Sequence, residues 1–186
     1  DGWSADYTAD ISGWTTDAYR YIKIYTPVSS SEVGVSQRHN GKWDNTKYRI
    51  VDDTVGINIT GSITRDIWID GLQIYLNSVV SHGNSGILIN QSGVVDHRIS
   101  NNIVQGVTNM MYVHVGIYNY AASAGSAVRI WNNIVYNFSG SDLAGSDGFG
   151  INTLSNFTAY IYNNTVYGCY NGYANTGTTI AKNNIA

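Results

Sequence analysis

The sequence contains a single cysteine, Cys169, in 186 residues. One cysteine cannot form a disulfide within the chain, and neither a second cysteine nor a neighbouring histidine stands at metal-site spacing. A disulfide-stabilised scaffold and a cysteine-based metal centre are therefore excluded. We expect Cys169, in the context Tyr-Gly-Cys-Tyr, to be a buried structural thiol.

Charged residues are also scarce, at 12% of the chain, and the formal net charge is −3. The ten Lys and Arg residues are scattered without a run. Such a chain has no strong field to attract nucleic acid or an anionic membrane, so neither partner is expected. Apolar residues make up 43%, and Gly, Asn, Ser, Thr and Tyr fill much of the rest. This composition is typical of an all-β protein with an extracellular or cell-surface location.

No apolar run is long enough for a membrane-spanning helix, and neither a signal peptide nor a Pro-rich linker is present. We expect no membrane insertion and one domain with a continuous core. The chain begins at Asp1 without Met and stops within a repeated pattern at Ala186. We therefore expect the natural protein to extend beyond both ends.

The most informative feature is an internal repeat. Ile-Ser-Asn-Asn-Ile-Val occupies 99–104, Ile-Trp-Asn-Asn-Ile-Val 130–135 and Ile-Tyr-Asn-Asn-Thr-Val 161–166, so the three copies are evenly spaced. The same interval, counted back from Asn102, reaches Gly71, where Asp-Gly replaces Asn-Asn. A further copy, at 181–186, follows after a shorter interval.

A second strand-like segment recurs between these copies, at 86–90, 116–119 and 148–152. Its apolar and polar residues alternate with period two, and no apolar stripe of helical period occurs, which excludes helical solenoids. A β-propeller needs about 40 to 45 residues per blade, which is more than this spacing allows. The pattern predicts stacked coils in which equivalent strands pair in parallel, about 4.8 Å apart.

Stacking of this kind aligns equivalent side chains in columns. We expect two inward columns, because alternate residues face opposite sides of a strand: Ile99, Ile130, Ile161 and Ala181, and Ile103, Ile134, Thr165 and Ile185. Asn-Asn marks a corner, since Asn tolerates the left-handed conformation of a sharp bend. We expect the second Asn of each pair to form a structural hydrogen-bonded ladder along the axis, at Asn102, Asn133, Asn164 and Asn184.

On these repeats the chain resembles the right-handed parallel β-helix family, which includes pectate-lyase-like enzymes, phage tailspikes and bacterial surface proteins. The resemblance covers about residues 55–186. It implies an all-β, right-handed parallel β-helix, a single-stranded solenoid of about five to seven coils. We expect residues 1–54 to add N-terminal coils with a long loop excursion, and residues 55–186 to hold the repeats, in one continuous domain.

The resemblance also directs attention to carboxylates. β-Helix enzymes of this family typically combine acidic side chains that bind calcium with a base, or use paired Asp residues around a glycosidic bond. The candidate catalytic group is Asp96, His97 and Arg98, with Asp70 one coil earlier; a loop end and two solvated positions are the alternative. Asp142 and Asp147 form a weak calcium candidate in a loop that lacks dedicated calcium-site spacing. We expect no metal and no cofactor.

Aromatic residues suggest a contact surface instead. From the repeat spacing we expect Trp131 and Tyr162 to share one outward column, and Tyr136 and Tyr167 to share another beyond the Asn corner. Arg129 lies in a neighbouring outward column with Arg98. Flat, partly exposed rings can stack on sugars or pack against a protein, and Arg adds cation–π contacts; the alternative is that long loops cover these rings.

Three functions follow from these features. The first is a non-catalytic extracellular structural or adhesive protein, with self-association through open β-helix ends into a filament. The second is a polysaccharide lyase or glycoside hydrolase acting on a cell-surface or plant-type polysaccharide. The third is a non-catalytic glycan-binding module. Fold alone does not select among them, so the site must decide.

Overall fold

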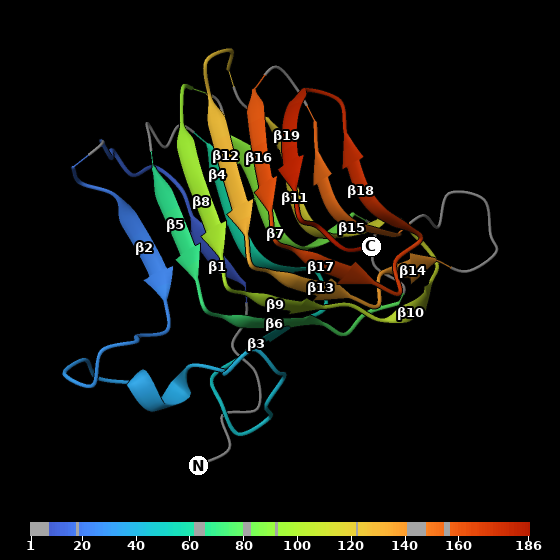
Figure 1. Ribbon diagram of the computed structural model, residues 1–186, viewed down its shortest axis with the longest axis horizontal. Coiled ribbons are helices and arrows are strands. Elements are labelled where there is room, and N and C mark those ends of the chain that lie inside the picture. Colours follow the sequence, from blue (N-terminus) through green and yellow to red (C-terminus); the bar gives the residue numbers. More distant parts are fainter. Residues whose placement is uncertain are drawn as a thin grey trace.

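The computed structural model describes residues 8–17, 19–61, 66–79, 83–91, 93–121, 123–140, 148–154 and 157–186. This part of the chain is all-β, with one short 3₁₀ turn, η1 (Val35–Gln37). Its strands form stacked parallel sheets (Figure 1). The all-β prediction is confirmed, and the arrangement is compatible with the predicted solenoid.

Three sheets contain nearly all of the strands. Sheet A contains β1 (Ala9–Ile11), β4 (Val55–Gly61), β7 (Asn84–Gln91), β11 (His114–Ala121), β15 (Gly148–Thr153) and β18 (Asn171–Asn175). Sheet B contains β2 (Ile22–Tyr25), β5 (Ile67–Asp70), β8 (Asp96–Ser100), β12 (Ala127–Trp131), β16 (Thr158–Tyr162) and β19 (Thr178–Lys182). Sheet C contains β3 (Ile50–Asp52), β6 (Gln73–Leu76), β9 (Ile103–Gln105), β13 (Ile134–Tyr136) and β17 (Thr165–Tyr167).

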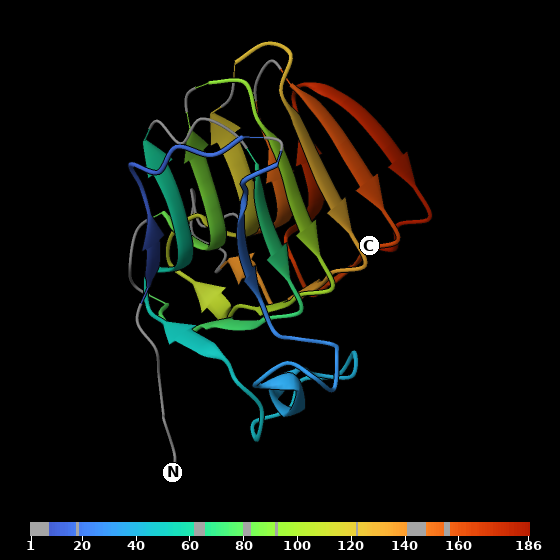
Figure 2. The ribbon, with the colours of Figure 1, turned by 90° about the vertical axis from the view of Figure 1, so that its left-hand side faces the viewer.

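The chain passes through sheets A, B and C in turn and then returns to sheet A beside its previous strand. We call one such passage a circuit. Parallel pairing keeps repeats in register, so Ile130 lies between Ile99 and Ile161. A small sheet of β10 (Thr108–Met110) and β14 (Ser139–Gly140) adds to the third and fourth circuits. Figure 2 shows the strands of successive circuits side by side.

The core lies between the three sheets. Ile99, Ile130 and Ile161 are almost fully buried there, as the sequence predicts, whereas Ala181 is exposed. The prediction for the second column is wrong. Val104, Val135 and Val166 fill the interior from sheet C, while Ile134 and Thr165 are half-buried and Ile185 is 65% exposed. Ile103 is buried, yet it lines an outer cleft rather than the core cluster.

The reason for this error lies at the corner between sheets B and C. The first Asn of each pair has a left-handed backbone, with φ of 55° at Asn101, 56° at Asn132 and 55° at Asn163. This residue turns the chain, so the alternation of one strand does not continue into the next. The second Asn points inward, and the residue two positions later then also faces the core.

Glycine lets sheets A and C approach closely. At Gly116, an added Cβ would lie 2.6 Å from the backbone oxygen of Gly150 and would overlap Val135 Cγ1. Gly86 and Gly150 meet Val104 and Val166 in the same way. The valine column of sheet C therefore packs directly against the backbone of sheet A.

The second Asn of each pair forms hydrogen bonds from one circuit to the next. Asn133 Nδ2 donates to Asn164 Oδ1 at 3.0 Å and to the Ile99 carbonyl at 3.0 Å. Asn133 Oδ1 in turn accepts from the backbone N and Nδ2 of Asn102, each at 3.0 Å. Asn164 bonds to Asn184 in the same manner. Buried backbone groups at the corner thereby find partners inside the fold.

One alignment from the sequence needs correction. Gln73 pairs with Ile103 and Asp70 with Ser100, so Gly71 is level with Asn101 rather than Asn102. Gly71, with φ of 76°, takes the left-handed position. Leu72 takes the inward position, and its backbone N donates to Asn102 Oδ1 at 3.0 Å. The interval from Gly71 to its equivalent, Asn101, is therefore one residue shorter than the sequence pattern indicates.

Residues 27–49 leave the stack between β2 and β3 and return to it. This excursion, which contains η1, lies outside the corner between sheets B and C (Figures 1 and 2). Asp44 N donates to Gln73 Oε1 at 2.7 Å, which fixes the excursion to the second circuit.

We predict that Asn133→Ala lowers the free energy of unfolding by about 3 kcal/mol or more, because it leaves buried donors and acceptors of the neighbouring circuits unpaired. The matched control is Asn132→Gly. Asn132 is exposed, and glycine adopts its left-handed backbone freely, so we expect a change within about 1 kcal/mol. Urea denaturation measures both. Equal losses in the two variants would contradict a structural role for the Asn133 amide.

Candidate functional site

The four candidate catalytic residues do not form one group. On β8, Asp96 and Arg98 face outward and are half-buried, whereas His97 faces the interior and is 0% exposed. Asp70 lies at the end of β5, level with Ser100. The alternation of the strand therefore separates the imidazole ring of His97 from the two side chains beside it in sequence.

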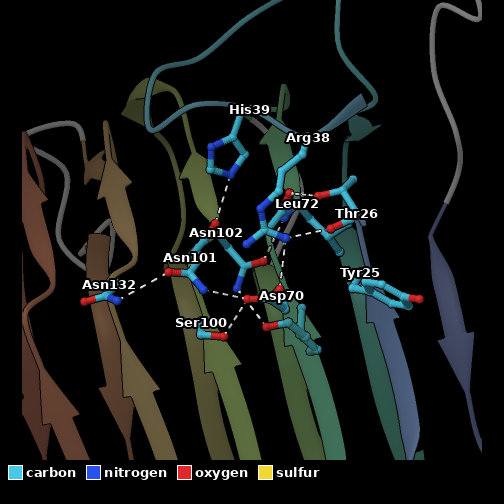
Figure 3. A network of polar contacts seen from close by, with 12 residues as sticks. Tyr25, Thr26, Arg38, His39, Asp70, Leu72, Ser100, Asn101, Asn102 and Asn132 are labelled. Atoms are coloured by element: carbon cyan, nitrogen blue, oxygen red, sulfur yellow. Dashed lines mark hydrogen bonds and ion pairs between the residues drawn. The ribbon is translucent and has the colours of Figure 1, made fainter. Parts of the chain in front are cut away.

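Asp70 is held in a dense set of polar contacts at the corner (Figure 3). Arg38 Nη1, from the excursion, lies 2.9 Å from Asp70 Oδ2 and donates to the Thr26 carbonyl at 2.6 Å. Ser100 Oγ and Asn101 Nδ2 donate to Asp70 Oδ1 at 2.8 and 2.7 Å. Burial by itself raises the pKa of Asp70, but these donors outweigh it and lower the pKa. Asp70 stays ionised and anchors the excursion to the stack.

Asp96 lies too far from Asp70 to act with it on one glycosidic bond. Asp70 pairs with Ser100, which lies four residues after Asp96 on β8. Four residues of a strand span about 13 Å. Paired carboxylates in glycosidases stand about 5 to 9.5 Å apart. Asp96 is also engaged by cations, with Arg129 Nε at 2.9 Å and Arg98 Nη2 at 3.8 Å.

His97 is a core residue. Neither ring nitrogen has a hydrogen-bond partner among the described residues. Burial lowers the pKa of His97 to about 4, although the negative charge of Asp96 opposes this shift. The ring is neutral at physiological pH and is out of reach of any ligand on the outer face.

The outer surface of sheet B brings aromatic and arginine side chains together in register. We call this surface the aromatic face; all of its members are half-buried. They are Trp68, Arg98, Arg129, Trp131, Tyr160 and Tyr162.

Two parallel rows make up the aromatic face. In the first, strand pairing places Trp68, Arg98, Arg129 and Tyr160 at one level. The guanidinium of Arg98 lies 4.4 Å from the Trp68 ring centroid, and that of Arg129 lies 4.7 Å from Tyr160. In the second row, Trp131 is level with Tyr162. In the first row, an arginine thus lies over a face of the Trp68 ring and of the Tyr160 ring, and Tyr21 also stacks on Trp68, with 4.1 Å between ring centroids.

Tyr136 and Tyr167 lie on sheet C instead. Their rings stack at 5.4 Å with an interplanar angle of 7°, and Tyr136 Oη donates to Gln105 Oε1 at 2.8 Å. Tyr167 is 58% exposed. The pair forms a separate, smaller aromatic surface beyond the corner.

A cleft of about 210 Å³ opens at the corner, between the excursion and the third and fourth circuits. Both polar and apolar groups line it, in nearly equal shares: Arg38, His39, Gly41, Asn101, Asn102, Ile103, Asn132 and Ile134. His39 Nε2 lies 2.9 Å from the Asn101 carbonyl oxygen, which ties the excursion to the corner. This cleft borders the second row of the aromatic face, since Asn132 directly follows Trp131.

Among the residues that the structure describes, the other candidate groups form no metal or reactive site. Asp142 and Asp147 lie outside the described residues. Within the described ranges, no three His, Cys, Asp or Glu side chains gather as a metal-binding group. Cys169 is half-buried, and burial raises the pKa of its thiol to about 11, so it is a poor nucleophile. No helix in the described part of the chain is long and apolar enough to span a membrane.

Four residues of these sites were not singled out from the sequence: Arg38, His39, Trp68 and Tyr160. Trp68 and Tyr160 carry a usable signal, because they stand one repeat before Arg98 and one repeat after Arg129. Arg38 and His39 carry none, since the excursion interrupts the repeat and its contacts with Asp70 and Asn101 are non-local.

Comparison with known proteins returns no relative. No family model matches the chain, and neither a curated protein nor a solved structure matches it.

We predict that His97 makes stability depend on pH between about 6.5 and 4. Its pKa is lower in the folded state, so acid protonates the unfolded chain first, and the free energy of unfolding falls as pH decreases. The shift from 6.5 to about 4 corresponds to roughly 3 kcal/mol.

His97→Val supplies the control, because Val128 occupies the equivalent position one circuit later. Urea denaturation at several pH values should give this variant a smaller loss of stability between pH 6.5 and 4 than the wild type shows. Identical pH profiles would mean that His97 is not a buried neutral ring.

Proposed function

We propose that this chain is a right-handed parallel β-helix at the cell surface or outside the cell, and that it is a non-catalytic adhesive module. Its ligand is a polysaccharide, which binds across the aromatic face. The observation that carries the proposal is the in-register pair of Trp131 and Tyr162, which lies beside the arginine-containing row of Trp68, Arg98, Arg129 and Tyr160.

The chemistry of this face suits sugars. The C–H groups of a pyranose ring pack on flat aromatic rings, while its hydroxyl groups need hydrogen-bond donors and acceptors. Arg98 and Arg129 supply donors, and their side chains remain 35% and 41% exposed. Adjacent strands place equivalent side chains about 4.8 Å apart, so a long chain can contact several in succession.

Rigidity supports the same conclusion. The rings project from paired strands, and cation–π contacts and an ion pair to Asp96 hold the arginines. A surface that is already ordered loses little conformational entropy when a ligand binds. Adhesion to an extended polysaccharide then gains from many weak contacts repeated along the stack.

The carboxylates favour binding over catalysis. Arg38 balances the negative charge of Asp70 in an ion pair. Arg129 and Arg98 balance the negative charge of Asp96 in the same way. The two lie about 13 Å apart by strand geometry, which leaves neither a general acid nor a nucleophile across one glycosidic bond. A lyase or hydrolase is therefore the less favoured function for this group of residues.

End-to-end self-association stays a prediction of the sequence. It would use the edges of sheets A and B, where β18 and β19 each pair on one side only among the described strands, since Ile185 already bridges to Thr165 at the edge of β17. Sedimentation velocity at increasing protein concentration measures it directly.

The test of the proposed function is Trp131→Ala. We expect it to weaken binding by about tenfold, in line with the loss of one ring contact of about 1.4 kcal/mol. Affinity electrophoresis in gels that contain soluble neutral or uronic-acid polysaccharides measures the change. Tyr170→Ala is the control, because Tyr170 is 67% exposed but lies outside sheet B.

Equal binding by the wild type and Trp131→Ala would remove the aromatic face as the ligand site. Release of new reducing ends or unsaturated uronates from the same polysaccharides would overturn the non-catalytic assignment. In that case Asp96→Asn, which removes a carboxylate from the outer face, becomes the first variant to assay.

A further inference from the structure

The chain contains two Asn-Gly dipeptides, Asn40-Gly41 and Asn171-Gly172. This dipeptide is the one most prone to intramolecular cyclisation, because glycine leaves its backbone nitrogen sterically accessible to the preceding side chain. The fold places the two copies in opposite environments. We propose that Asn40 is a site of spontaneous covalent modification, through a succinimide to aspartate and isoaspartate, and that His39 promotes it.

The atoms balance without any oxidant or cofactor. The backbone nitrogen of Gly41 loses its proton and attacks Asn40 Cγ, forming a five-membered ring. The Cγ–Nδ2 bond breaks, and the amide nitrogen leaves as ammonia with a proton. Water then opens the succinimide at either carbonyl carbon. Opening at the side-chain carbonyl gives aspartate, and opening at the backbone carbonyl gives isoaspartate.

Solvent exposure and backbone freedom favour cyclisation at Asn40. Both Asn40 and Gly41 are exposed in the excursion, and no heavy atom lies within 4 Å of the position that a Cβ on Gly41 would occupy. Gly41 has φ of 87°, a loop conformation outside any strand. Backbone rotation toward the cyclising geometry therefore breaks no sheet pairing.

His39 is positioned to take the proton from the attacking nitrogen. Gly41 N donates to His39 Nδ1 at 3.1 Å. His39 Nε2 lies 2.9 Å from the Asn101 carbonyl oxygen, which can only accept, so Nε2 carries the ring proton and the lone pair of Nδ1 is free for Gly41. This is the geometry of a general base on the nitrogen that must be deprotonated.

The surroundings of His39 keep the ring neutral. Burial lowers the pKa of His39, and the positive charge of Arg38 acts in the same direction, while the Asn101 carbonyl and Asp70 oppose it. Arg38 and Asp70 are the charged groups that face the ring, and they form an ion pair with each other. The base is thus in its active form at neutral pH.

The fold protects the second Asn-Gly dipeptide, at Asn171, from cyclisation. It lies in β18, half-buried, and pairs with Phe149 of β15, while Tyr173 pairs with Ile151 on the other side of Gly172. Parallel pairing holds this backbone extended. Cyclisation there requires local opening of the sheet edge.

Modification would alter the corner cleft. Isoaspartate inserts an additional backbone carbon between residue 40 and Gly41, which displaces the Gly41 N–H from His39 Nδ1. Both products add a negative charge to an excursion that is anchored by the Arg38–Asp70 ion pair. We therefore expect modified chains to hold the excursion less tightly against Asn101.

The experiment is peptide mapping by mass spectrometry after incubation of the folded protein at neutral pH, with isoaspartate detected by enzymatic methylation. A parallel sample in urea gives the rate of each dipeptide in the unfolded chain. We expect Asn40 to convert in the folded protein at least as fast as in urea, and Asn171 to convert several-fold more slowly than in urea. An intact Asn40, or equal folded-state rates at the two positions, would overturn the proposal.

Two variants test separately which residue is modified and whether His39 acts as the base. Asn40→Gln needs a six-membered ring for cyclisation, so modification at residue 40 should disappear while Asn171 behaves as before. His39→Gln keeps a hydrogen-bond acceptor but removes the base, so conversion at Asn40 should slow several-fold. Conversion at the wild-type rate in His39→Gln would refute the assignment of His39 as the base.

Discussion

The structure depends on how buried backbone groups are satisfied at the corner between sheets B and C. A sharp corner leaves N–H and C=O groups that the adjacent sheets cannot pair. The second Asn of each repeat supplies both a donor and an acceptor, so Asn102, Asn133 and Asn164 connect one circuit to the next. The first Asn turns the chain with its left-handed backbone. Two adjacent residues of one type thereby perform two different tasks.

The aromatic face follows from this constraint. Because the corners are in register, the strands that lead into them are in register too, and side chains one repeat apart meet on the outer surface. Arg98 over Trp68 and Arg129 over Tyr160 are the result. The same alternation directs His97 into the core beside the hydrophobic residues of sheet B. Arg98 of the aromatic face and the buried, neutral imidazole of His97 are thus neighbours on one strand, β8.

The repeat made much of the fold predictable. The even spacing of Asn102, Asn133 and Asn164 identified parallel stacking, because structures with equivalent strands one above another require such regularity. The inward column of sheet C was not predictable, because the left-handed corner residue resets the alternation between Ile99 and Val104. Among the candidate site residues, Trp131 and Tyr162 could be assigned to one column from spacing alone. Arg38 and His39 could not, since the excursion follows no repeat and its contacts span 32 and 62 residues.

The central claim is that polysaccharide binds to the outer surface of sheet B. The most direct measurement is a titration of the protein, labelled with ¹⁵N at its tryptophan side chains, with a soluble oligosaccharide, followed through the indole N–H signals by NMR. We predict shifts for Trp68 and Trp131, and none for Trp14 or Trp43, although Trp14 is 63% exposed. Shifts confined to Trp14 or Trp43, or binding that leaves Trp68 and Trp131 unchanged, would contradict the account.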